Sequence, residues 1–105
     1  MSFPTDMTGM ADKADTVSAF LKGLANGHRL MILCHLSQGE CSVGALIEAT
    51  GLAQTSMSQH LAKLKSGGLV DCRRDHRTLH YFIDHPAVLE IMTVLYSHFC
   101  GKDQD

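Results

Sequence analysis

Amide and hydroxyl side chains crowd the segment 54–63, and a strongly basic segment follows at 73–77. Glutamine can pair with adenine through two hydrogen bonds, and serine or threonine can bond to bases or phosphates. Arginine and lysine neutralise phosphates. These residue types in this order indicate contact with double-stranded DNA. The candidate contacts are Gln54, Thr55, Ser56, Ser58, Gln59, His60, Lys63, Arg73, Arg74, His76 and Arg77. For His60 we favour packing inside the protein over contact with the DNA backbone.

The charge of the chain is unevenly distributed. The net charge is −2, which taken alone argues against a nucleic-acid partner. The segment 54–80, however, carries five Lys or Arg against two Asp, while the segment 81–105 carries one Lys against four acidic residues. A basic segment in an otherwise acidic chain is a local electrostatic footprint that the net charge hides.

The elements that must position these side chains follow from apolar periodicity. It predicts helices over 10–25, 29–37, 43–50 and 54–66, strands over 69–73 and 78–83, and a last helix that begins at Pro86. The short turn Gly51-Leu52-Ala53 is typical of a helix-turn-helix, and the charged hairpin after it would be a wing. The predicted fold class is therefore mainly α with a β-hairpin, a winged helix-turn-helix in the order α-α-α-α-β-β-α.

Length and composition restrict the class of protein. A chain of 105 residues suggests one domain, expected at 10–100 between an N-terminal tail at 1–9 and a C-terminal tail at 101–105. It has no Cys-x-x-Cys, no phosphate-binding loop and no familiar metal-ligand spacing, so we expect no catalytic residue, cofactor or metal. It also has no apparent secretion signal or membrane span. We therefore expect a cytoplasmic protein with four free thiols.

Two segments carry a resemblance to a known family. The sequences LANGHRLMIL at 24–33 and SQHLAKLKSGGLV at 58–70, found together, resemble the ArsR/SmtB family of winged-helix repressors, and the likeness extends over about residues 20–100. The resemblance implies a homodimer formed by the first and last helices, here 11–24 and 88–99. It also implies binding to an imperfect palindrome and release when an inducer is sensed.

The sensory sites of this family differ between its branches. The arsenic-type site would place Cys-Val-Cys where this chain has Ser42-Val43-Gly44, and the zinc-type Asp-x-His is out of register at residues 84–86. The chain is instead similar to the thiol-based branch, which contains biofilm-growth-associated and persulfide-sensing repressors and a haemolysin regulator. That similarity implies a switch in which reactive sulfur species or oxidants bridge Cys34 and Cys100 and DNA is released.

Two alternatives remain open at this point. One is a metal-responsive repressor with an atypical site built from Cys34, His98 and Cys100. The other is a pure interaction module, which salt-dependent DNA affinity would exclude. Of the other thiols, Cys41 lies just before a helix N-terminus, which favours a thiolate, whereas Cys72 lies in a strand and is interpreted as structural.

Overall fold

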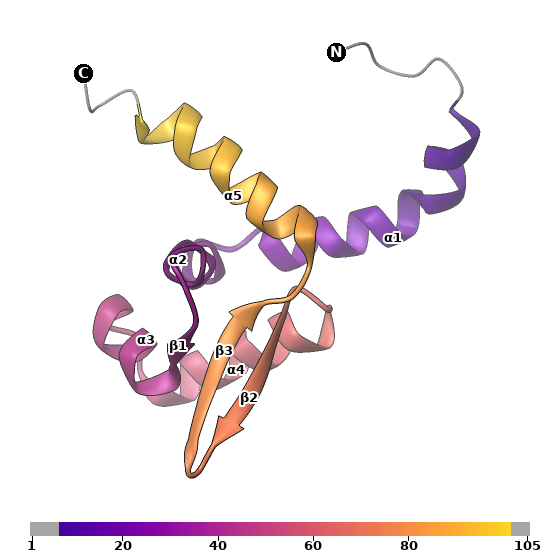
Figure 1. Cartoon of the computed structure of the whole chain (residues 1–105). Helices are drawn as coiled ribbons and strands as arrows, with labels where there is room; N and C mark the ends of the chain where they lie inside the picture. Colours follow the sequence, from indigo (N-terminus) through magenta and orange to yellow (C-terminus); the bar gives the residue numbers. More distant parts are fainter. Residues whose placement is uncertain (1–6, 102–105) are drawn as a thin grey trace.

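The computed structural model describes residues 7–101, which form five helices and a three-stranded sheet. Figure 1 shows a central body from which the first and last helices project in different directions. The predicted order of helices and hairpin is confirmed, with one strand added. The elements are α1 (Thr8–Leu24), α2 (Gly27–Leu36), β1 (Cys41–Ser42), α3 (Val43–Thr50), α4 (Gln54–Ser66), β2 (Val70–Asp75), β3 (Thr78–Ile83) and α5 (Pro86–Phe99).

The helix-turn-helix is formed by α3 and α4, and its boundaries follow from local chemistry. The Ser42 hydroxyl accepts a hydrogen bond from the Ala45 amide, 3.1 Å away, and so caps α3 as predicted. Gly51 ends α3 at φ 77°, a left-handed conformation that glycine adopts without strain. Ala53 precedes α4 and provides no side-chain cap. The three-residue turn therefore has the glycine stop that the sequence predicted.

The wing is the β2–β3 hairpin, and a third strand extends it. Strands β2 and β3 pair antiparallel from Val70 opposite Ile83 to Asp75 opposite Thr78. Strand β3 has the predicted bounds, whereas β2 reaches two residues further toward the tip than predicted and leaves only residues 76–77 between the two strands. Strand β1, which pairs antiparallel with β3, was not predicted. A two-residue strand has too few positions to show an alternating pattern, so no sequence signal marks it.

Two helix boundaries also differ from the prediction. The first helix begins at Thr8, so Thr8 and Gly9 belong to the helix and not to the predicted N-terminal tail. The other predicted tail residues at 1–6, and residues 102–105 of the predicted C-terminal tail, lie outside the described residues. The second helix begins at Gly27, two residues before its predicted start. Its true N-cap is Asn26, whose side-chain oxygen accepts a hydrogen bond from the Arg29 amide at 3.1 Å. Because Asn26 caps the helix, Gly27 is its first residue and does not interrupt it.

One hydrophobic core holds the helix-turn-helix against α2, the wing and the start of α5. All five helices and strand β2 contribute at least one buried apolar side chain, whereas β1 and β3 contribute none. The buried apolar residues are Leu24, Ile32, Leu33, Leu36, Leu46, Met57, Leu61, Leu64, Leu69, Val70, Val88 and Met92. Because α4 supplies three of them, the predicted reading helix is firmly anchored by its apolar stripe.

The two projecting helices keep apolar side chains in contact with solvent. On α1 these are Met10 and Leu21, and on α5 they are Leu89, Val94, Tyr96 and Phe99, the last 76% exposed. Only the first part of α5 is buried, at Val88 and Met92. A single chain therefore leaves much of both helices uncovered (Figure 1). None of the helices within residues 7–101 combines the length and the hydropathy that crossing a bilayer requires.

Candidate DNA interface and thiol pocket

The first turns of α4 present most of the predicted reading side chains to solvent. Met57, Leu61 and Leu64 face the core, and the opposite side of the helix carries the polar residues. Exposed side chains among the candidates are Gln54, Thr55, Ser58, Gln59 and Lys63, while Ser56 and His60 are half-buried. An exposed polar face on a helix held from behind is the geometry that major-groove reading requires.

His60 lies against a second histidine at the junction of α2 and α4. Its ring centroid is 5.6 Å from that of His28. Burial, assisted by the charges of Arg29, His28 and Lys63, lowers the pKa of His60 below its ordinary value. A half-buried imidazole packed on another ring accords with the packing role favoured from sequence.

A groove brings the start of α4 together with the wing. Its volume is about 680 Å³. Gln54, Ser58 and Lys65 line it from α4, and Arg77 lines it from the tip of the wing. Amide, hydroxyl and cationic groups thus face one surface, although 23 residues of sequence separate Gln54 from Arg77. This arrangement can meet base edges and phosphates at the same time.

The wing cations divide into paired and unpaired groups. The Arg73 guanidinium binds the Glu40 carboxylate, with Nε 3.0 and 3.2 Å from the two oxygens and a second nitrogen also in contact. This hydrogen bonding lowers the pKa of Glu40 and raises that of Arg73. His76 Nε2 lies 3.7 Å from Asp75 Oδ1. Within residues 7–101, Arg74 and Arg77 form no ion pair and are exposed. Both are therefore available to phosphates without first breaking a contact.

Neutralising Glu40 should strengthen binding to DNA of any sequence. In Glu40→Gln the carboxylate no longer competes with phosphate for Arg73, so one more phosphate can be neutralised. The slope of log affinity against log salt should steepen by at most about 0.9. Titration of labelled DNA at several salt concentrations measures both quantities. Glu90→Gln on α5 removes the same charge away from the wing and should leave the slope unchanged; an equal effect of the two variants would contradict the role of the pair.

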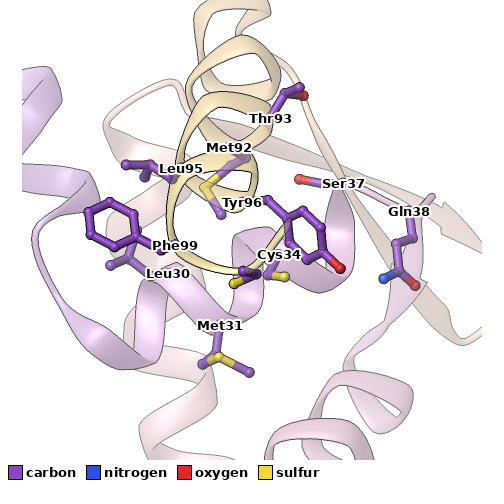
Figure 2. Close-up of a pocket in the computed structure, with 11 residues that line it drawn as sticks. Leu30, Met31, Cys34, Ser37, Gln38, Met92, Thr93, Leu95, Tyr96 and Phe99 are labelled. Atoms are coloured by element: carbon purple, nitrogen blue, oxygen red, sulfur yellow. The ribbon is translucent and has the colours of Figure 1, made fainter. Parts of the chain in front are cut away.

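Cys34 and Cys100, from α2 and from the end of α5, line one hollow. Its volume is about 570 Å³. Cys34 is half-buried and Cys100 is exposed. Figure 2 shows Cys34 on α2 with Met92 and Tyr96 of α5 close to it. The complete lining is Leu30, Met31, Cys34, Ser37, Gln38, Met92, Thr93, Leu95, Tyr96, Phe99 and Cys100. Two thiols that are 66 positions apart in sequence therefore face the same cavity.

The other two thiols lie elsewhere, in the sheet. Cys41 on β1 and Cys72 on β2 both sit opposite Tyr81 of the central strand β3. Burial, together with the charge and hydrogen bonding of Cys72, raises the pKa of Tyr81. Neither Cys41 nor Cys72 lines the hollow with Cys34. Cys72 lies in a strand of the wing as predicted, and its structural role stays a prediction.

The metal alternative is not assembled in the structure. Among residues 7–101, no three His, Cys, Asp or Glu side chains converge closely enough to hold a metal ion. Cys34, His98 and Cys100 therefore do not form such a group. His98 is exposed and does not line the hollow.

Two residues with clear structural roles carried no role in the sequence analysis. Arg29 is 9% exposed, and its Nε donates to the Gly23 carbonyl at 2.7 Å while a terminal nitrogen donates to the Lys22 carbonyl at 3.1 Å. It therefore caps the end of α1 from within α2. Glu40, the partner of Arg73, is the second. No sequence signal marked either residue, because Arg29 follows the polar residues 26–28 and directly precedes the apolar run 30–33, and Glu40 lies in a loop.

Comparison with known proteins agrees with this geometry. Residues 26–71 match the family described as "Bacterial regulatory protein, arsR family". The nodulation protein NolR of Rhizobium meliloti is 43% identical over 94 residues, which cover 90% of this chain and 76% of that protein. A biofilm growth-associated repressor of Xylella fastidiosa is 34% identical over 95 residues, covering 90% and 83% of the two chains.

Solved structures show the same fold. Reduced HlyU from Vibrio cholerae superposes with a TM-score of 0.83 at 36% identity, covering 88% of this chain and 97% of that one. A homodimeric winged helix-turn-helix DNA-binding domain from Mycobacterium bovis gives a TM-score of 0.74 at 40% identity, covering 90% and 86%. The matched segment contains the capped α2, the helix-turn-helix and the start of the wing. The chain therefore belongs to the ArsR family of winged helix-turn-helix transcriptional regulators, which are DNA-binding proteins and not enzymes.

Proposed function

We propose that this chain is a homodimeric repressor that releases its operator when Cys34 and Cys100 become bridged by reactive sulfur or an oxidant. The observation that carries the proposal is that both thiols line one hollow between α2 and α5. The cytoplasm suits such a switch, because its thiols are kept reduced until an inducer arrives.

Dimerisation is proposed through α1 and α5. These helices expose large apolar side chains outside the thiol hollow, including Leu21, Leu89 and Val94, that a partner would cover. The Mycobacterium bovis neighbour, which matches 90% of this chain, is described as homodimeric. Two α4 helices related by a twofold axis would read two half-sites about one DNA turn apart, so the operator is expected to be an imperfect palindrome.

DNA contact is proposed through α4 and the wing. The exposed α4 residues would meet base edges, Lys63 would contact phosphate, and Arg74 and Arg77 would meet phosphates or the minor groove. The groove shared by Gln54, Ser58 and Arg77 supports the joint use of helix and wing. For Arg73 and His76, DNA contact requires exchange of an existing carboxylate partner for phosphate.

Gln59→Ala should weaken operator binding by about 1–3 kcal/mol and relax sequence preference, because the amide is proposed to read a base. Arg77→Ala is the contrasting variant, since it removes a phosphate contact and should weaken binding to all sequences alike. Competition between operator and random DNA measures both effects. Unchanged preference in Gln59→Ala would place the reading residues elsewhere.

The chemistry of bridging by a persulfide RSSH can be written in two steps. The Cys34 thiolate takes the outer sulfur, giving Cys34–S–SH and RSH once a proton is returned. The Cys100 thiol then attacks the inner sulfur, forming Cys34–S–S–Cys100 and releasing H₂S. Two thiols are oxidised to a disulfide, and the sulfane sulfur is reduced to sulfide. If both cysteines are persulfidated first, loss of H₂S instead leaves a trisulfide.

The bridge would affect DNA binding through the elements that it joins. Leu33 and Leu36 of α2 belong to the core that holds α3 and α4, and α5 is the proposed dimer helix. A covalent tie between them would alter the separation of the two α4 helices. A preference of a few kcal/mol for the non-binding arrangement is sufficient, since about 1.4 kcal/mol changes affinity tenfold.

The test combines mass spectrometry with DNA binding. The operator is first selected from random DNA with reduced protein, and the protein is then treated with a persulfide donor or with peroxide. We expect reduced protein to bind, and release to parallel the appearance of a peptide pair joined through Cys34 and Cys100. Release without that linked pair, or a linked pair with no release, would overturn the proposal.

A further inference from the structure

The hollow that holds both thiols is lined almost entirely by apolar groups. Five of its residues are leucine, methionine or phenylalanine on α2 and α5, with Tyr96 beside them. The polar groups besides the thiols and the tyrosine hydroxyl are the neutral side chains of Ser37, Gln38 and Thr93. No residue of the lining carries a fixed positive or negative charge.

This lining determines which reagents can approach the sulfur atoms. An anionic reagent that enters must leave water without gaining a cationic partner, and such desolvation is costly. A neutral apolar reagent instead buries its surface against Leu30, Met92 and Phe99, which is favourable. The hollow of about 570 Å³ falls in the size range of small-molecule sites.

We propose that this hollow is a binding site for neutral, apolar sulfur compounds, and that the two thiols react preferentially with alkyl or aryl disulfides and trisulfides, which carry no charge, rather than with anionic peptide or carboxylate-bearing ones. The proposal rests on the thiol switch proposed above and specifies its inducer. It predicts that recognition comes from the apolar body of the inducer, with the reacting sulfur placed between Cys34 and Cys100.

The reaction with a disulfide RSSR balances without another oxidant. The Cys34 thiolate attacks one sulfur, forming Cys34–S–S–R and releasing RS⁻, which takes up the proton that Cys34 lost. The Cys100 thiol attacks the Cys34 sulfur, forming Cys34–S–S–Cys100 and releasing the second RSH. Two thiols are oxidised to one disulfide, and one RSSR is reduced to two RSH.

The test compares two aromatic disulfides of opposite character, the neutral 4,4′-dithiodipyridine and the dianionic 5,5′-dithiobis(2-nitrobenzoate). The protein carries Cys41→Ser and Cys72→Ser, so that only Cys34 and Cys100 react. Each rate is divided by the rate with a neutral small thiol, which removes the intrinsic reactivity of the reagent. We expect this normalised rate to be at least about tenfold higher for the neutral reagent. A ratio near one, or reversed, would overturn the proposal.

A variant that places a positive charge in the lining tests whether the uncharged lining causes the selectivity. Thr93 lines the hollow on α5 and is exposed, so a lysine there supplies the missing cation without entering the core. Thr93→Lys should raise the normalised rate of the anionic reagent several-fold, and the uncharged Thr93→Met should not. An unchanged anionic rate in Thr93→Lys would count against the lining as the cause of selectivity.

Failure of this inference and failure of the proposed function give different results. Reagent selectivity is measured on the thiols alone, without DNA. If selectivity is present but the bridged protein still holds its operator, the hollow is an apolar thiol site and the switch is wrong. If the bridged protein releases DNA but reacts equally with both reagents, the switch stands and the inducer class is wrong.

Discussion

The Cys100→Ser protein is expected to bind its operator as tightly as the unaltered chain and to keep it when a persulfide is added. Cys100 is exposed at the end of α5, so serine there removes no buried contact and should leave fold and DNA affinity unchanged. The bridge cannot form with one thiol, so the release, expected to be tenfold or more in affinity (about 1.4 kcal/mol), should disappear. Fluorescence anisotropy with labelled operator, before and after treatment, measures both parts.

The remaining cysteines provide the comparisons. Cys34→Ser should lose the response in the same way, although its half-buried site makes a modest loss of stability expected as well. Cys41→Ser and Cys72→Ser should retain both binding and response, because these thiols lie in the sheet beside Tyr81. A Cys100→Ser protein that still releases DNA, or a Cys41→Ser protein that does not, would contradict the assignment of the switch.

The number of sulfur atoms in the bridge is a further readout of the same experiment. A plain disulfide needs Cα atoms within about 7 Å, and additional sulfur atoms relax that limit. Intact mass spectra of treated protein give the bridge length directly.

The helical part of the fold was predictable because its signals are local. Ser42 and Gly51 mark the two ends of α3, and the stripe of Met57, Leu61 and Leu64 defines the buried side of α4. Each signal needs only neighbouring residues, so composition and spacing were sufficient. The exposed polar side of α4 follows from the same periodicity, which is why its candidate residues could be named without a structure.

Features that depend on contacts between distant segments were less predictable. The pairing of Arg73 with Glu40 spans 33 positions, and no local pattern indicates that a wing cation will meet a carboxylate there. Strand β1 exists because β3 offers it a partner, and its two residues have no strand pattern of their own. Cys34 and Cys100 could be paired only through family resemblance, since the apolar hollow around them is built jointly by α2 and α5.

Arg29→Met should cause the largest loss of stability expected from a single change outside the apolar core. The guanidinium is nearly buried, and it satisfies the carbonyls of Gly23 and Lys22 at the end of α1. Hydrogen bonds to charged groups contribute about 1.5–3 kcal/mol each in favourable cases, and methionine leaves both carbonyls without this donor. We expect the free energy of unfolding to fall by about 2–4 kcal/mol.

The same change should weaken dimerisation, because Arg29 fixes the direction in which α1 leaves the body of the protein (Figure 1). Urea unfolding at several protein concentrations separates the loss of subunit stability from the loss of dimerisation, since only the contribution of dimerisation to the free energy of unfolding depends on protein concentration. Arg29→Lys keeps the charge but loses the fork that reaches two carbonyls, so an intermediate loss is expected. Lys22→Met removes an exposed cation at the same junction and should change stability by less than about 0.5 kcal/mol. If Lys22→Met and Arg29→Met lose equal stability, charge at the junction, rather than capping of α1, is the cause.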